Sequence, residues 1–264
     1  MLTVSALYIY PVKSLGGFSL PAATLTDRGF KYDRRWMLID ENDRFISQRE
    51  VAVMAFLNAT IGEEHLLVTD KRTGDLIMIP YEPLTSETIT VSVWDDTCVA
   101  QRVSDEADTW FSQHLGMPCR LVYMPDSTQR TVDANYAHNQ EITSFSDGYP
   151  LLIIGQASLD DLNSRLTSPL PMNRFRPNIV FTGGLPFQED DMKQFNIGDI
   201  QFSGVKPCAR CVITTIDQET GVKAKEPLKT LSTYRAKNQK IYFGQNLLFN
   251  GSGTISVGDI ITLP

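Results

Sequence analysis

Short runs of β-forming residues, separated by turn signals, occupy most of this chain and constrain its fold more than any other feature. Residues 88–94 alternate between polar and apolar side chains, which is typical of a strand with one buried face. Residues 71–74 carry the signature of a hairpin turn between two such runs. Further runs expected to form strands lie at residues 2–10, 35–40, 65–69, 75–79, 179–181 and 255–263. The pattern predicts a mainly β protein.

Helix signals are few. Residues 105–115 carry their apolar side chains on one face, with Ser104 as an N-cap and Gly116 as the terminating residue. A second helix is expected at about residues 159–166, where leucines share one stripe. A third is expected at residues 227–234, because its leading proline suits the first helical turn.

The chain of 264 residues is long enough for one large domain or two modest ones. The helix at 105–115 is the best candidate for a divider between them. We therefore expect a smaller N-terminal β-rich domain at residues 1–103 and a larger domain at residues 104–264. The larger domain should resemble a β-barrel, with few helices.

Composition limits the classes of function. Hydrophobic residues make up 42% of the chain and charged residues 21%, as is usual for a soluble globular protein. The net charge is −7, whereas nucleic-acid-binding domains carry a basic surplus. The N-terminus lacks the segments of a secretory signal, and no apolar run reaches membrane-spanning length. We expect a cytoplasmic protein that binds neither nucleic acid nor a membrane.

Two of the four cysteines, Cys208 and Cys211, lie three residues apart beside Lys206 and Arg210. The basic neighbours are expected to favour thiolates, which suit a soft or high-valent metal. The residues that follow, 212–217, are β-rich, whereas a thioredoxin-like pair is expected near a βαβ unit. A structural zinc site needs a second ligand pair, and an iron–sulfur cluster needs a longer cysteine run. On the motif alone, inert or weakly redox-active cysteines remain the simplest interpretation.

Basic residues recur near the ends of predicted strands. Arginine makes forked contacts with phosphates and oxyanions, although any one of these residues alone is best read as a surface charge. Together with the cysteine pair, they predict a site for an anionic cofactor that is completed by one cysteine. The set consists of Lys13, Arg34, Arg35, Arg49, Arg174 and Arg176.

Several segments, ordered along nearly the whole chain, carry a family resemblance. They lie at residues 10–14, 33–36, 146–150, 157–166, 175–180, 207–211 and 243–246. In these segments the chain resembles the MOSC domain family, in the arrangement with an N-terminal MOSC-associated β-barrel domain. That arrangement includes the mitochondrial amidoxime-reducing components and their bacterial counterparts. The ordered combination is highly specific, whereas no single segment is.

The resemblance implies a molybdenum cofactor, Mo-molybdopterin, in which the two sulfurs of a phosphorylated pterin hold the metal. It implies Cys211 as the metal ligand and catalytic residue, with Cys208 in a supporting role. Lysine and arginine would neutralise the phosphate, and asparagine would read the donor–acceptor edge of the pterin. The implied cofactor contacts are Lys13, Ser14, Arg34, Asp147, Gly148, Tyr149, Arg176, Asn178, Ala209, Arg210 and Asn246.

The activity implied by the resemblance is a molybdenum-dependent reduction of small N-hydroxylated compounds: hydroxylamines, amidoximes or N-hydroxylated base analogues. Because this sequence lacks the ferredoxin domain of some family members, we expect a separate flavin or iron–sulfur protein to supply electrons. Two alternatives stay open. One is a non-catalytic carrier of molybdenum cofactor or sulfur that holds a persulfide on Cys208 or Cys211. The other is a structural barrel without cofactor, against which the basic set argues.

Overall fold

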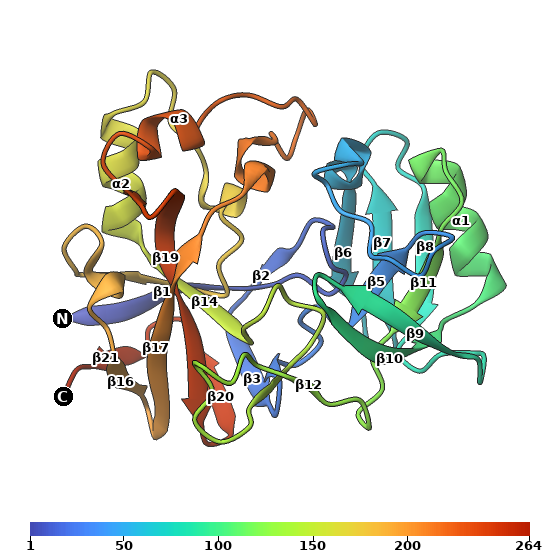
Figure 1. Ribbon diagram of the computed structural model, residues 1–264, viewed down its shortest axis with the longest axis horizontal. Coiled ribbons are helices and arrows are strands. Elements are labelled where there is room, and N and C mark those ends of the chain that lie inside the picture. The colour runs from blue at the N-terminus through green and yellow to red at the C-terminus, as the bar shows by residue number, and fades with distance from the viewer.

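The computed structural model describes residues 1–264 and consists of two lobes (Figure 1). Both chain ends lie in the same lobe. The chain starts there, crosses to form the other lobe, and returns for its C-terminal half. Strands predominate and only three α-helices form. The predicted mainly β fold with few helices is therefore confirmed.

The lobe that holds both ends is a closed barrel of seven strands. Their order is β14-β15-β1-β21-β16-β17-β19, and β19 closes the ring by pairing with β14. All neighbours are antiparallel except β14 and β15. The strands are β14 (Leu151–Gly155), β15 (Ile179–Thr182), β1 (Leu2–Ile9), β21 (Ile260–Thr262), β16 (Gln194–Ile197), β17 (Ile200–Ala209) and β19 (Lys240–Asn250). The first strand thus completes a barrel built otherwise from residues beyond 150.

Smaller elements surround this barrel. Strand β2 (Phe18–Leu20) pairs with β1, and β18 (Ala236–Lys237) pairs with β19. A separate sheet has the order β20-β3-β4 and contains β20 (Gly253–Ser256), β3 (Ala22–Thr26) and β4 (Gly29–Phe30). The helices are α2 (Gln156–Ser164) and α3 (Leu228–Leu231), with 3₁₀ turns η2 (Met172–Arg174), η3 (Gln188–Asp190) and η4 (Val212–Thr215).

The other lobe contains two open sheets and one helix, α1 (Asp105–Leu115). One sheet has the order β5-β11-β10-β9: β5 (Trp36–Ile39), β11 (Arg120–Tyr123), β10 (Asp96–Arg102) and β9 (Thr88–Val93). The other is β6 (Leu57–Ile61), β7 (His65–Asp70) and β8 (Leu76–Pro80), preceded by η1 (Ala52–Phe56). A short hairpin of β12 (Arg130–Thr131) and β13 (Ile142–Thr143) lies on the path back to the barrel.

Each lobe has its own apolar core. The barrel interior is filled by aliphatic and aromatic side chains of opposing strands, among them Leu7, Phe181 and Phe202. The other lobe buries Trp36 and Phe111 in a separate cluster. These rigid cores hold in place the loops and strand ends that meet at the junction of the lobes.

The predicted elements were correct where local signals were strong. The hairpin at residues 65–80 is confirmed by the pairing of β7 with β8. Helix α1 has the predicted bounds, because Ser104 accepts a hydrogen bond from Ala107 N and Gly116 adopts a left-handed φ of 69°. Helix α2 begins earlier than predicted, and α3 is shorter.

Residues 212–217 were expected to be extended, and this expectation was wrong. Residues Val212–Thr215 form the 3₁₀ turn η4, in which the amide and hydroxyl of Thr214 both bond to Cys211 O. This local hydrogen bonding overrides the β preference of the branched side chains.

The predicted domain boundary between residues 103 and 104 stays a prediction. Helix α1 packs in the core of the smaller lobe, and β1 belongs to the barrel.

Candidate active site

A cavity of about 290 Å³ lies where the barrel meets the segments that lead to the smaller lobe. Its walls come from the end of β17, the facing part of β19, the loop before β14, and two segments near the N-terminus. All twelve predicted site residues line this one cavity: Lys13, Ser14, Arg34, Asp147, Gly148, Tyr149, Arg176, Asn178, Ala209, Arg210, Cys211 and Asn246.

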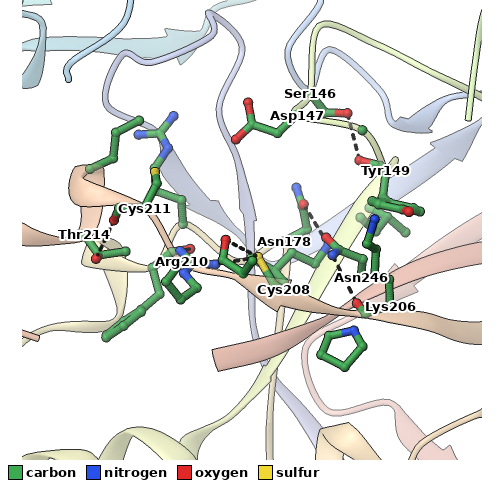
Figure 2. A pocket seen from close by; sticks show the side chains of 18 of the residues that line it. Ser146, Asp147, Tyr149, Asn178, Lys206, Cys208, Arg210, Cys211, Thr214 and Asn246 are labelled. Carbon is green, nitrogen blue, oxygen red and sulfur yellow. Dashed lines mark hydrogen bonds between the residues drawn. The ribbon is translucent and has the colours of Figure 1, made fainter. Parts of the chain in front are cut away.

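The register of β17 against β19 gives the cavity two ends. Lys206 pairs with Asn246, and Ala209 pairs with Tyr242, roughly 10 Å further along the strand. Beyond that pair, Arg210 N donates to Ile241 O. Figure 2 shows the result: Lys206 and Asn246 lie at one end of the cavity, whereas Cys211 and Thr214 lie at the other.

The two cysteines are free thiols in different surroundings. Cys211 follows the end of β17 and directly precedes η4, whose first turn bonds to its carbonyl. Cys208 packs against the apolar cluster that contains Phe175 and Phe243, and accepts a hydrogen bond of 3.0 Å from Arg210 Nη1. Burial raises the pKa of the Cys208 thiol, and Arg210 only partly opposes this. The expectation that its basic neighbours favour a thiolate was therefore wrong for Cys208.

Arg34 and Arg176 stack on the same ring. Their guanidinium carbons lie 4.5 and 4.3 Å from the centroid of Tyr10. Burial, with repulsion from Arg34, lowers the pKa of Arg176 to about 10. Arg34 pairs with the buried Asp33, whereas Arg176 has no carboxylate partner. An anion in the cavity would therefore stabilise the charge of Arg176 in particular.

Three residues of the cavity wall adopt left-handed backbone conformations although none is glycine. Their φ values are 67° at Ser14, 50° at Arg34 and 56° at Arg176. Such conformations cost about 1–3 kcal/mol each and concentrate at ligand sites, where the surrounding structure imposes them.

Lys13 and Asp147 form an ion pair of 2.6 Å across the junction. Trp94, in the β9–β10 turn of the smaller lobe, donates to the same carboxylate at 3.1 Å. Enclosure by the cavity walls disfavours the charge of Asp147, but Lys13 and Trp94 outweigh it and hold the pKa of Asp147 well below its usual range. The smaller lobe therefore helps to fix the loop that carries Asp147.

Asn178 lines the cavity, but its amide is fully used within the protein. Its Oδ1 accepts from Arg34 Nη1 and Leu152 N, and its Nδ2 donates to Tyr8 O and Asp33 Oδ2, all at 3.1–3.2 Å. An amide side chain has no further capacity. Asn178 therefore positions Arg34. Its residue type had suggested a contact with the edge of a pterin, but the side-chain amide has no free donor or acceptor for one.

The charge balance of the cavity points to an anionic ligand. Six basic side chains line it against the single carboxylate of Asp147, in a protein of net charge −7. Arg210 Nε and Tyr149 Oη are buried polar atoms without a hydrogen-bond partner, and such atoms are rare unless a ligand completes them. No group of three or more His, Cys, Asp and Glu side chains is arranged to bind a metal ion. The donors present thus fit an anionic organic group better than a bare cation.

Three of the predicted basic residues lie elsewhere. Arg35 donates to Met124 O and pairs with Asp126. Arg49 stacks on Trp94, and Arg174 donates to Thr214 O. These three residues and the basic residues of the cavity have the same sequence signal, a position near a strand end. That position does not determine which way a side chain points, so the sequence could not separate the two groups.

Some residues of the cavity were not predicted from the sequence. Ile213, Thr214, Lys240 and Tyr242 all line it. Only the register of β17 against β19 brings Lys240 and Tyr242 to Cys211, and no local motif marks them.

Two family models match most of this chain. A model of the MOSC N-terminal beta barrel domain matches residues 1–118, and a model of the MOSC domain matches residues 140–262. The chain belongs to the MOSC family. Among its MOSC relatives, the mouse protein named mitochondrial amidoxime-reducing component 1 is 34% identical over 99% of this chain and 82% of that protein.

Two further similarities are more limited. A rice protein named molybdenum cofactor sulfurase is 34% identical over 91% of this chain, but over only 32% of its own length. The crystal structure of YiiM from Geobacillus stearothermophilus overlaps 44% of this chain and 54% of YiiM, at a TM-score of 0.33 and 15% identity. None of the helices has the length and apolar character to cross a membrane.

Proposed function

We propose that this protein binds a molybdopterin-type molybdenum cofactor in the cavity and reduces small N-hydroxylated compounds. The observation that carries the proposal is the excess of six basic side chains over one carboxylate around a free cysteine thiol. The similarity to amidoxime-reducing components over nearly the whole chain supports it.

The residues present fit such a group. Cys211 would supply the protein thiolate to the metal, because it lies at the cavity just beyond the end of β17 and its backbone is fixed by η4. Lys13, Arg34 and Arg176 would neutralise the phosphate of the pterin. Arg210 Nε and Tyr149 Oη offer buried donors to its polar atoms. When bound, the cofactor would supply two-electron redox chemistry at molybdenum.

The reaction takes R–NHOH, two electrons and two protons to R–NH₂ and water. The chain's own residues would bind the cofactor and the substrate and orient them for the reaction. Asp147 is held ionised by Lys13 and Trp94. In that state it accepts hydrogen bonds and orients Lys13, and it does not donate a proton at neutral pH.

The second candidate function is a carrier of molybdenum cofactor or sulfur. The 34% sequence identity with a protein named molybdenum cofactor sulfurase favours a carrier function. A carrier would hold a transferable sulfur on Cys208 or Cys211, whereas a reductase needs none.

Turnover distinguishes the two. We expect protein from a cofactor-competent host to contain molybdenum and to reduce a model hydroxylamine or amidoxime many times with reduced methyl viologen. Cyanide treatment should release no sulfur from either cysteine. A stoichiometric cyanide-labile sulfur without sustained turnover, in molybdenum-replete protein, would contradict the reductase and favour the carrier.

A further inference from the structure

Basic charge is concentrated in one segment of this acidic protein. Residues 222–240 contain one acidic residue, Glu226, and therefore carry a net charge of 6 − 1 = +5, which leaves −7 − 5 = −12 for the rest of the chain. The six basic residues of this segment are Lys223, Lys225, Lys229, Arg235, Lys237 and Lys240.

The lysines of this segment are exposed and lack carboxylate partners. Arg235 pairs with Asp190, and Lys223 Nζ donates to a backbone carbonyl. Lys225, Lys229, Lys237 and Lys240 are exposed and take part in no ion pair. Their charge is therefore available to a partner.

Two of these lysines face each other in a hairpin. Lys237 on β18 pairs directly with Lys240 on β19. The two residues between them, Asn238 and Gln239, have φ values of 49° and 60°, as in a type I′ turn. Like charges placed directly opposite destabilise a strand pair, so a bound anionic group would relieve this arrangement.

This basic surface borders the cavity at the Cys211 end. Lys240 lines the cavity, and the adjacent Ile241 O accepts from Arg210 N. Ala224 N donates to Thr215 O, which places the start of the segment beside η4. Val212 and Val222 are 50% and 61% exposed in these two neighbouring stretches. Exposed apolar side chains beside charged ones are common in protein interfaces.

We propose that the lysines of residues 222–240, with exposed Val212 and Val222 among them, form the docking surface for an acidic electron-transfer protein. This proposal rests on the proposed function, because such a partner is needed only where the site is reduced. A one-electron donor would be oxidised in two successive encounters and would deliver the two electrons of one turnover. The position beside Cys211 keeps the path to the cofactor short, and opposite charges steer association.

The test compares a protein donor with a small dye. The variant Lys225→Glu/Lys229→Glu/Lys237→Glu reverses three exposed charges outside the cavity. Lys31→Glu, an exposed lysine elsewhere on the chain, is the single-site control. The probes are a reduced plant-type ferredoxin and a flavodoxin, both acidic, against methyl viologen. With a protein donor, we expect kcat/KM of the variant to fall at least about tenfold and to depend no longer on salt concentration. With methyl viologen, the rate of the variant should equal that of the parent protein.

Direct binding separates this proposal from the proposed function. Titration calorimetry with either acidic protein at low salt needs no turnover, and should show binding to the parent protein and to the Lys31→Glu variant but not to the triple variant. Failure of viologen turnover alone would count against the reductase and not against docking. Docking is contradicted if neither acidic protein binds, if the triple variant binds as the parent does, or if a DNA duplex binds more tightly than both.

Discussion

At the scale of single residues, Cys208 and Cys211 lie on the same cavity wall and are predicted to play different roles. Both line the cavity, but only Cys208 is also packed against an apolar cluster and bonded to Arg210. We expect Cys211→Ser to abolish turnover with little change in stability. Cys208→Ala should keep most of the turnover and lose about 1 kcal/mol of unfolding free energy, since a packed side chain is truncated. Urea unfolding and a dye-driven assay on both variants measure this, and equal loss of activity in both would contradict it.

Replacing Arg176 should weaken cofactor binding without destabilising the cofactor-free protein. Its charge is partly desolvated and repelled by Arg34, and no carboxylate pairs with it. Arg176→Met should therefore leave the cofactor-free protein as stable as the parent or more so. It should weaken cofactor binding by about ten- to a hundredfold, the equivalent of one charge-assisted hydrogen bond.

The matched control for this prediction is Arg44→Met, which removes the same charge from an exposed site in the smaller lobe. Thermal unfolding of both variants and pterin content after expression give the two readouts. A destabilised cofactor-free Arg176→Met protein with normal pterin content would show that Arg176 has only a structural role.

At this scale the sequence was informative about which residues meet but not about what each does. All the residues implied by the family resemblance line one cavity. The full use of the Asn178 amide, and the burial that raises the pKa of Cys208, follow from packing between distant segments. Neither could be predicted from residue type.

At the scale of elements, caps and turns were predictable because their signals are local. Ser104 and Gly116 bound α1 as expected, and the hairpin of β7 and β8 forms where its turn residues indicate. The turn η4 was not predicted, because its residues are β-forming. Hydrogen bonds from the amide and hydroxyl of Thr214 to Cys211 O override that preference. The pairing of β19 with β14, which closes the barrel, joins segments far apart in the chain, and no local sequence pattern predicts it.

The turn η3 carries a buried carboxyl that should make stability depend on pH. Glu189 is fully buried, accepts one hydrogen bond from Ser158, and leaves Oε1 without a partner. Burial raises the pKa of Glu189 from 4.5 to about 7. Between these values the folded protein binds a proton that the unfolded chain has lost, so stability falls as pH rises from about 4.5 through about 7. The full effect is about 3 kcal/mol.

Glu189→Gln should remove this part of the pH dependence, because the amide does not titrate. Urea unfolding of the parent and variant at pH 5 and pH 8 measures the difference between their slopes. The same loss of stability with pH in both proteins would assign it to other groups.

At the scale of the whole molecule, two lobes build one site. The barrel supplies Cys211 and Arg210, and the smaller lobe holds the Asp147 loop through Trp94. The composition gave the net charge of −7, but only the fold shows that basic side chains gather at the cavity and on the surface beside it. The first strand belongs to the barrel, so the lobes are not successive along the chain.

Molybdenum X-ray absorption on the purified holo-protein tests directly whether this cavity holds molybdenum through Cys211, because it counts the sulfur ligands of the metal. We predict one sulfur ligand fewer in Cys211→Ser than in the parent protein, and no change in Cys208→Ser. An unchanged sulfur count in Cys211→Ser, or a loss only in Cys208→Ser, would contradict the assignment.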